Sequence, residues 1–446
     1  MSDQARATAR VTAQVASLYA SHPYPARDPE EERTRLIGTW LDDLRLVNHY
    51  GLGGAADFRG LRVLVAGGGT GDATVYLAEQ LREVGGEVVH LDLSDASIAI
   101  ARRRAEIRAL PNVRFVQGSL LDLPQLGLGE FGLINCVGVL HHLADPEAGL
   151  DRLLEALAPD GVLTLMVYAQ VGRTAVYQMQ ELLRRLDAGV DSLEERIAHA
   201  RSVLGVLPAT NWFVRSAGLH RDHEAGGDAG LADLLLHPQD RAYTVSQLYA
   251  WLVDRCGLHL HLSDWHRGAY AYEPAPLLAG ATPEVRAQAA RLPLREAQAV
   301  AELLRGDIIT HTLYATRRAD TVAPYGDADM VPMFANDRLD GAGMVALIGA
   351  KGDAPFELTH RVSGLAQRLD PGRHVKEIFR ALDERSSFAR IFDAVRRAPG
   401  IAGSAPAPSD EQLFAEFAPW YHALNRIERM VLRRPHAYAG IADRYA

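Results

Sequence analysis

The sequence predicts an α/β protein in which a mostly parallel sheet is covered by helices on both faces. Short apolar runs rich in Val, Ile and Leu recur between helical stretches. These runs are continuous rather than alternating, as expected for strands buried on both faces. The first run leads directly into a glycine-rich turn, and a helix and a second strand follow it, which is the order of a βαβ unit.

The elements follow one another in the order that such a sheet requires. The predicted strands are 61–66, 87–91, 113–116, 132–136, 161–168, 259–265 and 307–317. The predicted helices beside them are 71–83, 95–107, 146–157, 244–257 and 283–306. Helix 244–257 has a Ser/Thr start signal and a glycine stop. The strands therefore add up to a sheet of seven.

The length of 446 residues exceeds what one hydrophobic core usually supports, so more than one domain is expected. Residues 1–50 are predicted to be helical, with a break at 21–29, where prolines forbid a continuous helix. Residues 51–318 hold the sheet and an insertion at 189–240. Residues 319–446 begin with a segment punctuated by proline and glycine. We expect them to form a mostly helical C-terminal accessory domain, for which a winged-helix-like fold is one candidate.

Composition narrows the class of protein. The net charge of −9 disfavours a nucleic-acid partner, because such partners attract basic surfaces. Cys136 and Cys256 are predicted to be reduced core residues, and neither a signal peptide nor an 18-residue apolar run is found. We therefore expect a cytoplasmic protein without a membrane segment. The oligomeric state is left open, with a homodimer as one option.

The turn in RVLVAGGGTGDAT (62–74) indicates a nucleotide-like cofactor. Its glycines allow a sharp bend close to a ligand, and the following helix presents free N–H groups there. Asp92 closes the next strand, where a carboxylate can accept both hydroxyls of a ribose. A dinucleotide-binding turn needs glycine at the sixth position, where this chain has Asp72, so NAD is disfavoured.

This segment and those after it resemble the class I S-adenosylmethionine (SAM)-dependent methyltransferases. The resemblance rests on that turn and on SDASIAIARRRAE (94–106), NVRFVQGSLLDLP (112–124) and FGLINCVGVLHHLADPEAGLDRLLEALAPDGVLTLMVY (131–168). It is close over 60–170 and looser up to Arg317. It implies a seven-stranded Rossmann-like sheet whose last hairpin adds an antiparallel strand, an N-terminal helical lid over the cofactor, and SAM as the cofactor.

The resemblance also implies which residues hold SAM. They are Gly67, Gly68, Gly69, Gly71, Asp92, Leu93, Ser119, Leu120, Cys136 and Val137. The family's usual acidic residue at the adenine falls at Ser119 here, and Asp122 would need a shifted loop to replace it. The adenine contact is therefore open.

In that family the methyl acceptor binds at the carboxyl ends of strands 4 and 5, which is also where open α/β sheets place ligands. His141 is the candidate base there, with His142 second, and the alternative is a packing role. Tyr24, on a turn over the cofactor, and Arg241 and Tyr243, near a core helix, are the other candidate catalytic residues. The alternative for Tyr24 is that its turn is a strap with a packing role only. The alternative for Arg241 is a structural ion pair.

No metal is predicted. The spacing H-x-D-H at His220, Asp222 and His223 lacks the supporting partners that a metal site needs. The sequence thus predicts a SAM-dependent methyltransferase of an unidentified small-molecule or peptide/protein acceptor. The alternatives are a tRNA methyltransferase, a non-catalytic SAM-binding protein and, from another class, an NAD-dependent oxidoreductase.

Overall fold

The structure is a computed structural model that describes residue 15 and residues 21–335, 339–352, 354–399, 401–402 and 406–440, except for the side chains of Asp222 and Ala225. Most of the first 20 residues, predicted to be helical, therefore lie outside the described residues.

The central sheet has the predicted architecture. Its strands are β1 (Arg62–Ala66), β2 (Glu87–Asp92), β3 (Val113–Gln117), β4 (Phe131–Val137), β5 (Leu157–Ala169), β6 (Ala242–Tyr243), β7 (His259–Ser263) and β8 (Thr310–Thr316). The main order is β3-β2-β1-β4-β5-β8-β7. β1 to β5 are mutually parallel, and β8 is antiparallel to both β5 and β7. The prediction of a seven-stranded Rossmann-like sheet is confirmed.

One strand was not predicted from the sequence. The short β6 pairs with the end of β5, where Ala169 lies opposite Tyr243. Two residues carry too little hydrophobic pattern to be recognised as a strand. This pairing brings the segment around residue 240 to the carboxyl ends of β4 and β5.

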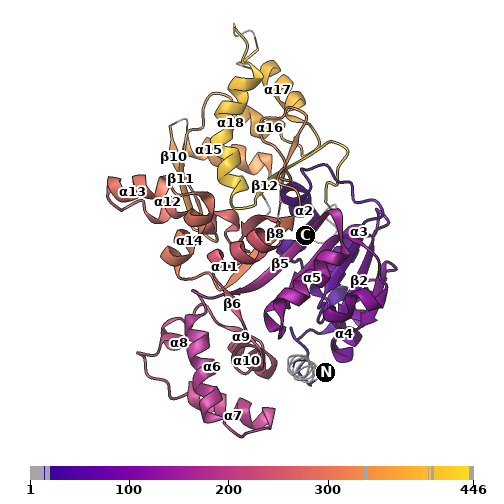
Figure 1. Cartoon of the computed structure of the whole chain (residues 1–446). Helices are drawn as coiled ribbons and strands as arrows, with labels where there is room; N and C mark the ends of the chain where they lie inside the picture. Colours follow the sequence, from indigo (N-terminus) through magenta and orange to yellow (C-terminus); the bar gives the residue numbers. More distant parts are fainter. Residues whose placement is uncertain are drawn as a thin grey trace.

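Helices cover the sheet on both faces, which gives three layers (Figure 1). On one face, α2 (Leu44–Gly51) and α3 (Asp72–Leu81) pack on the valines of β1 and β2. On the other, α5 (Pro146–Ala156) and the helical stretch from α11 (Val245–Leu248) through a π-helix at Tyr249–Arg255 bury Leu and Trp side chains. α4 (Asp95–Ile107) follows β2 and is capped by Ser94.

Five helices after β5 form a lobe at the lower end of Figure 1. They are α6 (Thr174–Leu186), α7 (Leu193–Leu204), α8 (Trp212–Arg215), α9 (Asp222–Ala225) and α10 (Gly227–Leu235). Val176, Met179, Phe213 and Leu231 belong to a small core of this lobe. Since α6 contributes to that core, the lobe begins before the insertion predicted at 189–240.

The chain then returns to the sheet and continues into a C-terminal part at the upper end of Figure 1. Between β7 and β8 of the sheet lie α12 (Pro274–Leu277), α13 (Pro283–Ala290) and α14 (Leu294–Arg305). The elements of the C-terminal part are β9 (Val331–Phe334), α15 (Gly341–Lys351), β10 (Phe356–His360), β11 (Leu365–Leu369), α16 (Val375–Ala381), α17 (Phe388–Arg397), α18 (Asp410–Asn425) and β12 (Met430–Arg433). Trp420 and Phe417 of α18 lie in a core of their own. β12 pairs with β9 and contacts α2, where the Leu432 N–H donates to His49 Nδ1 at 3.0 Å.

None of the helices among the described residues combines the length and the apolar character that crossing a bilayer requires.

Candidate functional site

The glycine turn after β1 has the backbone conformation that the sequence requires of it. Gly67, Gly69 and Gly71 have φ values of +75°, +51° and +99°, a region that side-chain-bearing residues rarely adopt. The N–H groups of Gly67 and Gly68 both donate to the Leu91 carbonyl, at 2.7 and 3.1 Å. The turn is thereby fixed beside the end of β2.

Asp92 lies at that end, and its two carboxylate oxygens face the turn. One accepts the Gly69 N–H and the other the Ser94 N–H, each at 2.8 Å. Burial raises the pKa of this carboxyl group above its ordinary value. A carboxylate oxygen can accept more than one hydrogen bond, so both remain able to receive a ribose hydroxyl. The carbonyl of Leu93, the next residue, accepts from Gln117.

The remaining predicted cofactor residues occupy the next two strand ends. Ser119 caps a 3₁₀-helix, Leu120–Leu126, and Leu120 is buried, whereas Asp122 is exposed. The Cys136 side chain lies in the hydrophobic core, so only the backbone of this residue can face a cofactor. Burial there raises the pKa of the thiol to about 12. Val137 is half-buried at the end of β4.

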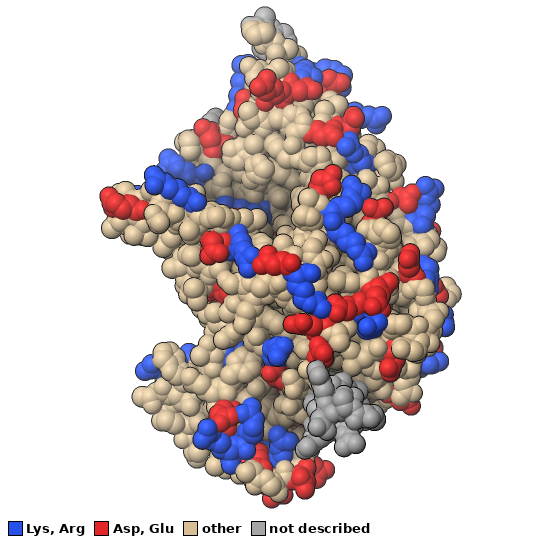
Figure 2. All heavy atoms as spheres, in the orientation of Figure 1, with Lys and Arg blue, Asp and Glu red and all other residues tan. Residues whose placement is uncertain are grey.

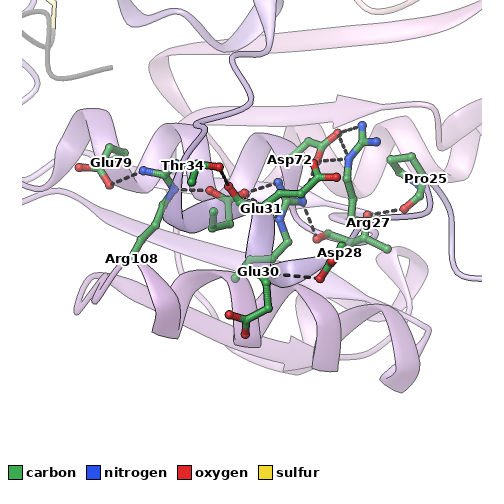
Figure 3. A network of polar contacts seen from close by, with 12 residues as sticks. Pro25, Arg27, Asp28, Glu30, Glu31, Thr34, Asp72, Glu79 and Arg108 are labelled. Atoms are coloured by element: carbon green, nitrogen blue, oxygen red, sulfur yellow. Dashed lines mark hydrogen bonds and ion pairs between the residues drawn. The ribbon is translucent and has the colours of Figure 1, made fainter. Parts of the chain in front are cut away.

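Residues 21–28, hereafter the strap, cross the glycine turn. The Thr70 hydroxyl donates to the Pro25 carbonyl at 2.7 Å. Arg27 holds Asp72 through two parallel hydrogen bonds, Nε to Oδ1 at 2.9 Å and Nη2 to Oδ2 at 2.6 Å (Figure 3). A Cβ atom at Gly69 would lie 3.0 Å from the Tyr24 carbonyl oxygen, so glycine is required for the strap to come this close.

A buried ion-pair network anchors the chain just after the strap. Glu32 pairs with Arg104 at 2.6 Å and with Arg108, and all three side chains are almost fully buried. Arg104 also pairs with Asp72 at 2.6 Å, so the network continues to the strap through Arg27. Asp72 at the sixth position of the turn thus has a structural role that glycine could not fill.

A second polar group, hereafter the β4–β5 cluster, lies where the sheet predicts the acceptor. Its members are His141, His142, Tyr168, Arg173, Asp233, His237 and Asp240, and all of them are buried. The His141 ring is 3.9 Å from the Tyr168 ring and 4.2 Å from the His142 ring. The Arg173 guanidinium stacks on Tyr168, 3.5 Å from the ring centre.

Hydrogen bonds connect this cluster to the helical lobe. Tyr168 donates to Asp233 of α10 at 3.3 Å, and Asp240 accepts from Tyr177 and Gln180 of α6 at 3.2 and 2.8 Å. Arg173 lies 3.5 Å from Asp240. The lobe therefore supplies both carboxylates of the cluster, whereas the sheet supplies its histidine pair and Tyr168.

Burial keeps the imidazoles of the cluster neutral. It lowers the pKa of His142 to about 4, that of His237 to about 3 and that of His141 well below its ordinary value. Both ring nitrogens of His141 lack a hydrogen-bond partner among the described residues. Burial, and then the Asp233 charge, raises the pKa of Tyr168, to which Tyr24 on the strap also contributes. The strap therefore contributes to the electrostatics of the cluster.

The other two predicted catalytic residues adjoin the cluster differently. The Arg241 N–H donates to the His141 carbonyl at 3.0 Å, but its side chain is exposed. Tyr243 is buried on β6 and stacks on Trp251 at 5.0 Å. Of the predicted catalytic residues, His141 belongs to the cluster and the Arg241 backbone contacts it, whereas Tyr243 lies on β6 and Tyr24 lies on the strap at the glycine turn.

Sequence reasoning missed Arg173 and Asp233. Arg173 follows directly after β5, at the strand end where an acceptor is expected. Asp233 is a charged residue at a buried position of the apolar helix GLADLLL, which is a signal that the helical pattern contains. In the H-x-D-H segment, His220 and His223 pack around Phe213, and the Asp222 side chain lies outside the described part.

Comparisons with known proteins agree with this geometry. A family model described as a methyltransferase domain matches residues 64–163. An uncharacterised protein of Synechococcus, syc1184_c, is 35% identical over 54% of this chain and 58% of its own length. The demethylmenaquinone methyltransferase of Thermus thermophilus is 38% identical over 24% of this chain and 47% of its own length. The chain spans about half the length of these curated relatives.

A solved structure extends the likeness in fold to most of the molecule. PKMT2 from Rickettsia typhi, in complex with AdoHcy, aligns with a TM-score of 0.58 at 14% identity. The alignment covers 89% of this chain and 76% of that protein. The matched segment of the family model begins in β1 and ends in β5, so it contains the glycine turn, Asp92 and the His141–His142 pair. The chain therefore contains a methyltransferase domain of the class I, Rossmann-like type, for which the methyl donor is S-adenosylmethionine.

Proposed function

We propose that this protein transfers the methyl group of SAM to an acceptor that binds in the β4–β5 cluster beneath the strap. The observation that carries the proposal is that the glycine turn and the cluster lie at the same edge of the sheet. The turn follows β1 and the cluster follows β4 and β5, which are neighbouring parallel strands, and the strap crosses the turn. Cofactor site and cluster are thus neighbours at the carboxyl ends of these strands.

The residues present fit SAM. The positive φ values of the turn, the close approach of the strap and the two oxygens of Asp92 form a cradle for a nucleoside. When bound, SAM supplies an electrophilic methyl group on a sulfonium whose departure needs no added proton. The task that remains for this chain is alignment of the acceptor, which can provide much of the rate enhancement.

We assign that task to the cluster and the strap. Tyr24 and Tyr168 wall the acceptor, the exposed Arg241 side chain selects among acceptors at the rim, and Tyr243 supports the wall from the core. The buried, neutral His141 offers a nitrogen lone pair as a base for an acceptor that must lose a proton. The part after residue 318 serves as an accessory unit, and its contacts with α2 link it to the sheet.

The acceptor is a small molecule or a peptide. Among relatives, the demethylmenaquinone methyltransferase and the tRNA 5-carboxymethoxyuridine methyltransferase of Escherichia coli differ in acceptor class. Figure 2 shows acidic and basic side chains interspersed over the face in view, rather than a continuous basic surface such as RNA prefers. An NAD-dependent role is disfavoured because Asp72 belongs to the ion-pair network.

Calorimetry with SAM and NAD tests the cofactor, and Asp92→Ala tests the site. Two charge-assisted hydrogen bonds of about 1.5–3 kcal/mol each predict a loss of SAM affinity of at least ~100-fold. Asp95→Ala, which changes a nearby exposed carboxylate, is the matched control and should bind normally. Since the raised pKa applies to Asp92, affinity should decline on acidification at a higher pH than for an ordinary aspartate. A folded Asp92→Ala protein with unchanged affinity would refute the assignment.

Turnover needs a separate measurement. Incubating the full-length protein with methyl-labelled SAM and a fractionated cell extract should label an acceptor that mass spectrometry identifies. Label in a small molecule or a peptide supports the proposal. Label only in RNA identifies the tRNA alternative, and normal SAM binding without any labelled product identifies a non-catalytic SAM-binding protein.

A further inference from the structure

Two histidines and an aspartate from different elements meet inside the β4–β5 cluster. His142 ends a 3₁₀-helix after β4, Asp233 lies on α10, and His237 follows that helix. One ligand atom from each of the three buried side chains lies within 4.8 Å of the other two. Within the ranges that the structure describes, this is the only group of three His, Cys, Asp or Glu side chains so arranged.

Gln239 positions both histidines through its backbone. Its carbonyl accepts a hydrogen bond from His142 Nδ1 at 2.8 Å, and its N–H donates to His237 Nδ1 at 3.2 Å. Because a carbonyl only accepts, His142 must carry its proton on Nδ1, which leaves the Nε2 lone pair for a ligand. A histidine held by a backbone carbonyl in this way is the usual arrangement beside a metal. His237 is held differently: its Nδ1 accepts the Gln239 N–H, so the neutral ring carries its proton on Nε2 and must give up this hydrogen bond to bind a metal through Nδ1.

The third group and its surroundings provide suitable charge. Asp233 accepts from the Tyr168 hydroxyl at 3.3 Å, and metal-binding carboxylates are commonly supported by such hydrogen bonds. Burial favours neutral imidazoles, the form that binds metals. Asp240 opposes the positive charge of Arg173 at 3.5 Å, and Asp233 adds a second carboxylate to the cluster, which favours a cation.

The two imidazoles are stacked, with ring centres 3.7 Å apart and planes inclined by 29°. In this stack the ring nitrogens do not converge on one point. Ligation therefore requires one ring to turn about its Cβ–Cγ bond toward Asp233, a torsion that is soft for histidine. The loss of this stack is a structural change that accompanies metal binding.

We propose that His142, Asp233 and His237 bind one divalent transition-metal ion at the carboxyl ends of β4 and β5. Two imidazoles and one carboxylate suit Zn²⁺, Fe²⁺, Co²⁺ or Ni²⁺, whereas Mg²⁺ and Ca²⁺ prefer sites built of oxygen. Three protein ligands leave a coordination position open. This metal site is separate from the H-x-D-H segment. It is contrary to the expectation from the sequence that the protein binds no metal.

The test uses the full-length protein without a histidine tag. After treatment with a chelator, the protein is titrated with Co²⁺ and, separately, with Zn²⁺ at pH 7.5. We expect one equivalent of Co²⁺ with visible absorption bands from nitrogen and oxygen ligands, and a rise in Tm with either metal. His237→Ala and Asp233→Asn should each lower the affinity by at least tenfold.

His220→Ala is the matched control, because His220 is an equally buried histidine of the same lobe that lies outside the metal-binding trio. It should keep both the stoichiometry and the rise in Tm. Wild-type protein that binds no equivalent of either metal overturns the proposal, as does binding that persists in both Asp233→Asn and His237→Ala. Thermal melts of the metal-free variants separate loss of ligand from loss of fold. No SAM is present in these titrations, so their outcome does not depend on the proposed function.

Discussion

At Gly69 the absence of a side chain is what allows the strap to approach the cofactor turn. The residue has φ of +51°, and an added Cβ would lie 3.0 Å from the Tyr24 carbonyl. Gly85, in an exposed turn, has φ of +70°, and an added Cβ there would have no neighbour within 4 Å. The two glycines therefore share the backbone constraint but differ in what surrounds them.

Gly69→Val and Gly85→Val should separate these two effects. Both variants force a side chain into the left-handed region, which costs about 1–2 kcal/mol of stability. Only Gly69→Val should also displace the strap, so we expect SAM affinity to fall by more than tenfold in that variant alone. Urea denaturation and calorimetry measure the two quantities. Equal SAM affinity in the two variants would show that the strap does not depend on Gly69.

The conformation of the glycine turn and its contact with Asp92 were predictable because they are local. Gly67, Gly69, Gly71 and Asp92 follow one another within a single βαβ unit, where the spacing itself determines which atoms meet. Asp233 joins His142 only after the lobe has folded onto the sheet, and no spacing between distant elements encodes that contact. The geometry of the glycine turn was therefore foreseeable, and the composition of the β4–β5 cluster was not.

The element that follows the strap is held by charge rather than by apolar packing. Glu32 lies on the short η1 (Pro29–Arg33), between Arg104 and Arg108 of the α4 region, and its side chain is 2% exposed. Arg27, nearer the turn, is 28% exposed and pairs with Asp72. Removing one partner of a buried pair costs far more than removing a partly exposed one.

Glu32→Gln should therefore destabilise the fold strongly, by about 3–5 kcal/mol, because two guanidinium groups lose a buried counter-charge. Arg27→Ala should cost about 1 kcal/mol or less, since water screens this pair. The free energies of unfolding in urea check both values. A similar decrease in the free energy of unfolding in the two variants would mean that the buried pairs of Glu32 are not what anchors this segment.

The elements were predicted best where the pattern was longest. Buried apolar strands such as β1 and β4 were found within about a residue of their bounds, since a short, continuous run of β-branched and apolar residues is typical of a strand buried on both faces. The helical stretch 244–257 was also found, but its change from α11 to a π-helix at Tyr249 was not. Trp251 and Leu252 of the π-helix are buried in the core, and the apolar pattern of the sequence does not mark where the helix changes.

At the scale of the whole molecule, Glu428 joins three parts of the chain. It follows α18, is fully buried, and accepts a hydrogen bond from the indole of Trp40, which precedes α2. Its other oxygen lies 3.9 Å from His261 Nε2 on β7. Burial is the largest cause that raises the pKa of Glu428 to about 7.

The other titratable groups near Glu428 do not reverse this effect. Burial lowers the pKa of His261 to about 3, so this histidine is neutral in the same pH range. Arg429 lowers the pKa of Glu428 and Asp264 raises it, and both are smaller influences than burial. The Glu428 side chain therefore stays protonated in the folded protein at pH values where an unfolded chain has already released that proton.

This difference predicts how stability depends on pH. Between the ordinary glutamate pKa, about 4.3, and about 7, the folded state binds the extra proton, so stability falls as the pH rises. Each unit of pKa difference is worth about 1.4 kcal/mol, which sets the loss at up to about 4 kcal/mol. Glu428→Gln keeps an oxygen for the Trp40 indole but cannot ionise, so it should be more stable than wild type at pH 8 and differ little at pH 5. Glu296→Gln, on the exposed side of α14, is the control and should retain the wild-type slope. Urea denaturation at the two pH values decides the matter, and equal slopes in wild type and Glu428→Gln would show that this buried carboxyl group does not govern how stability depends on pH.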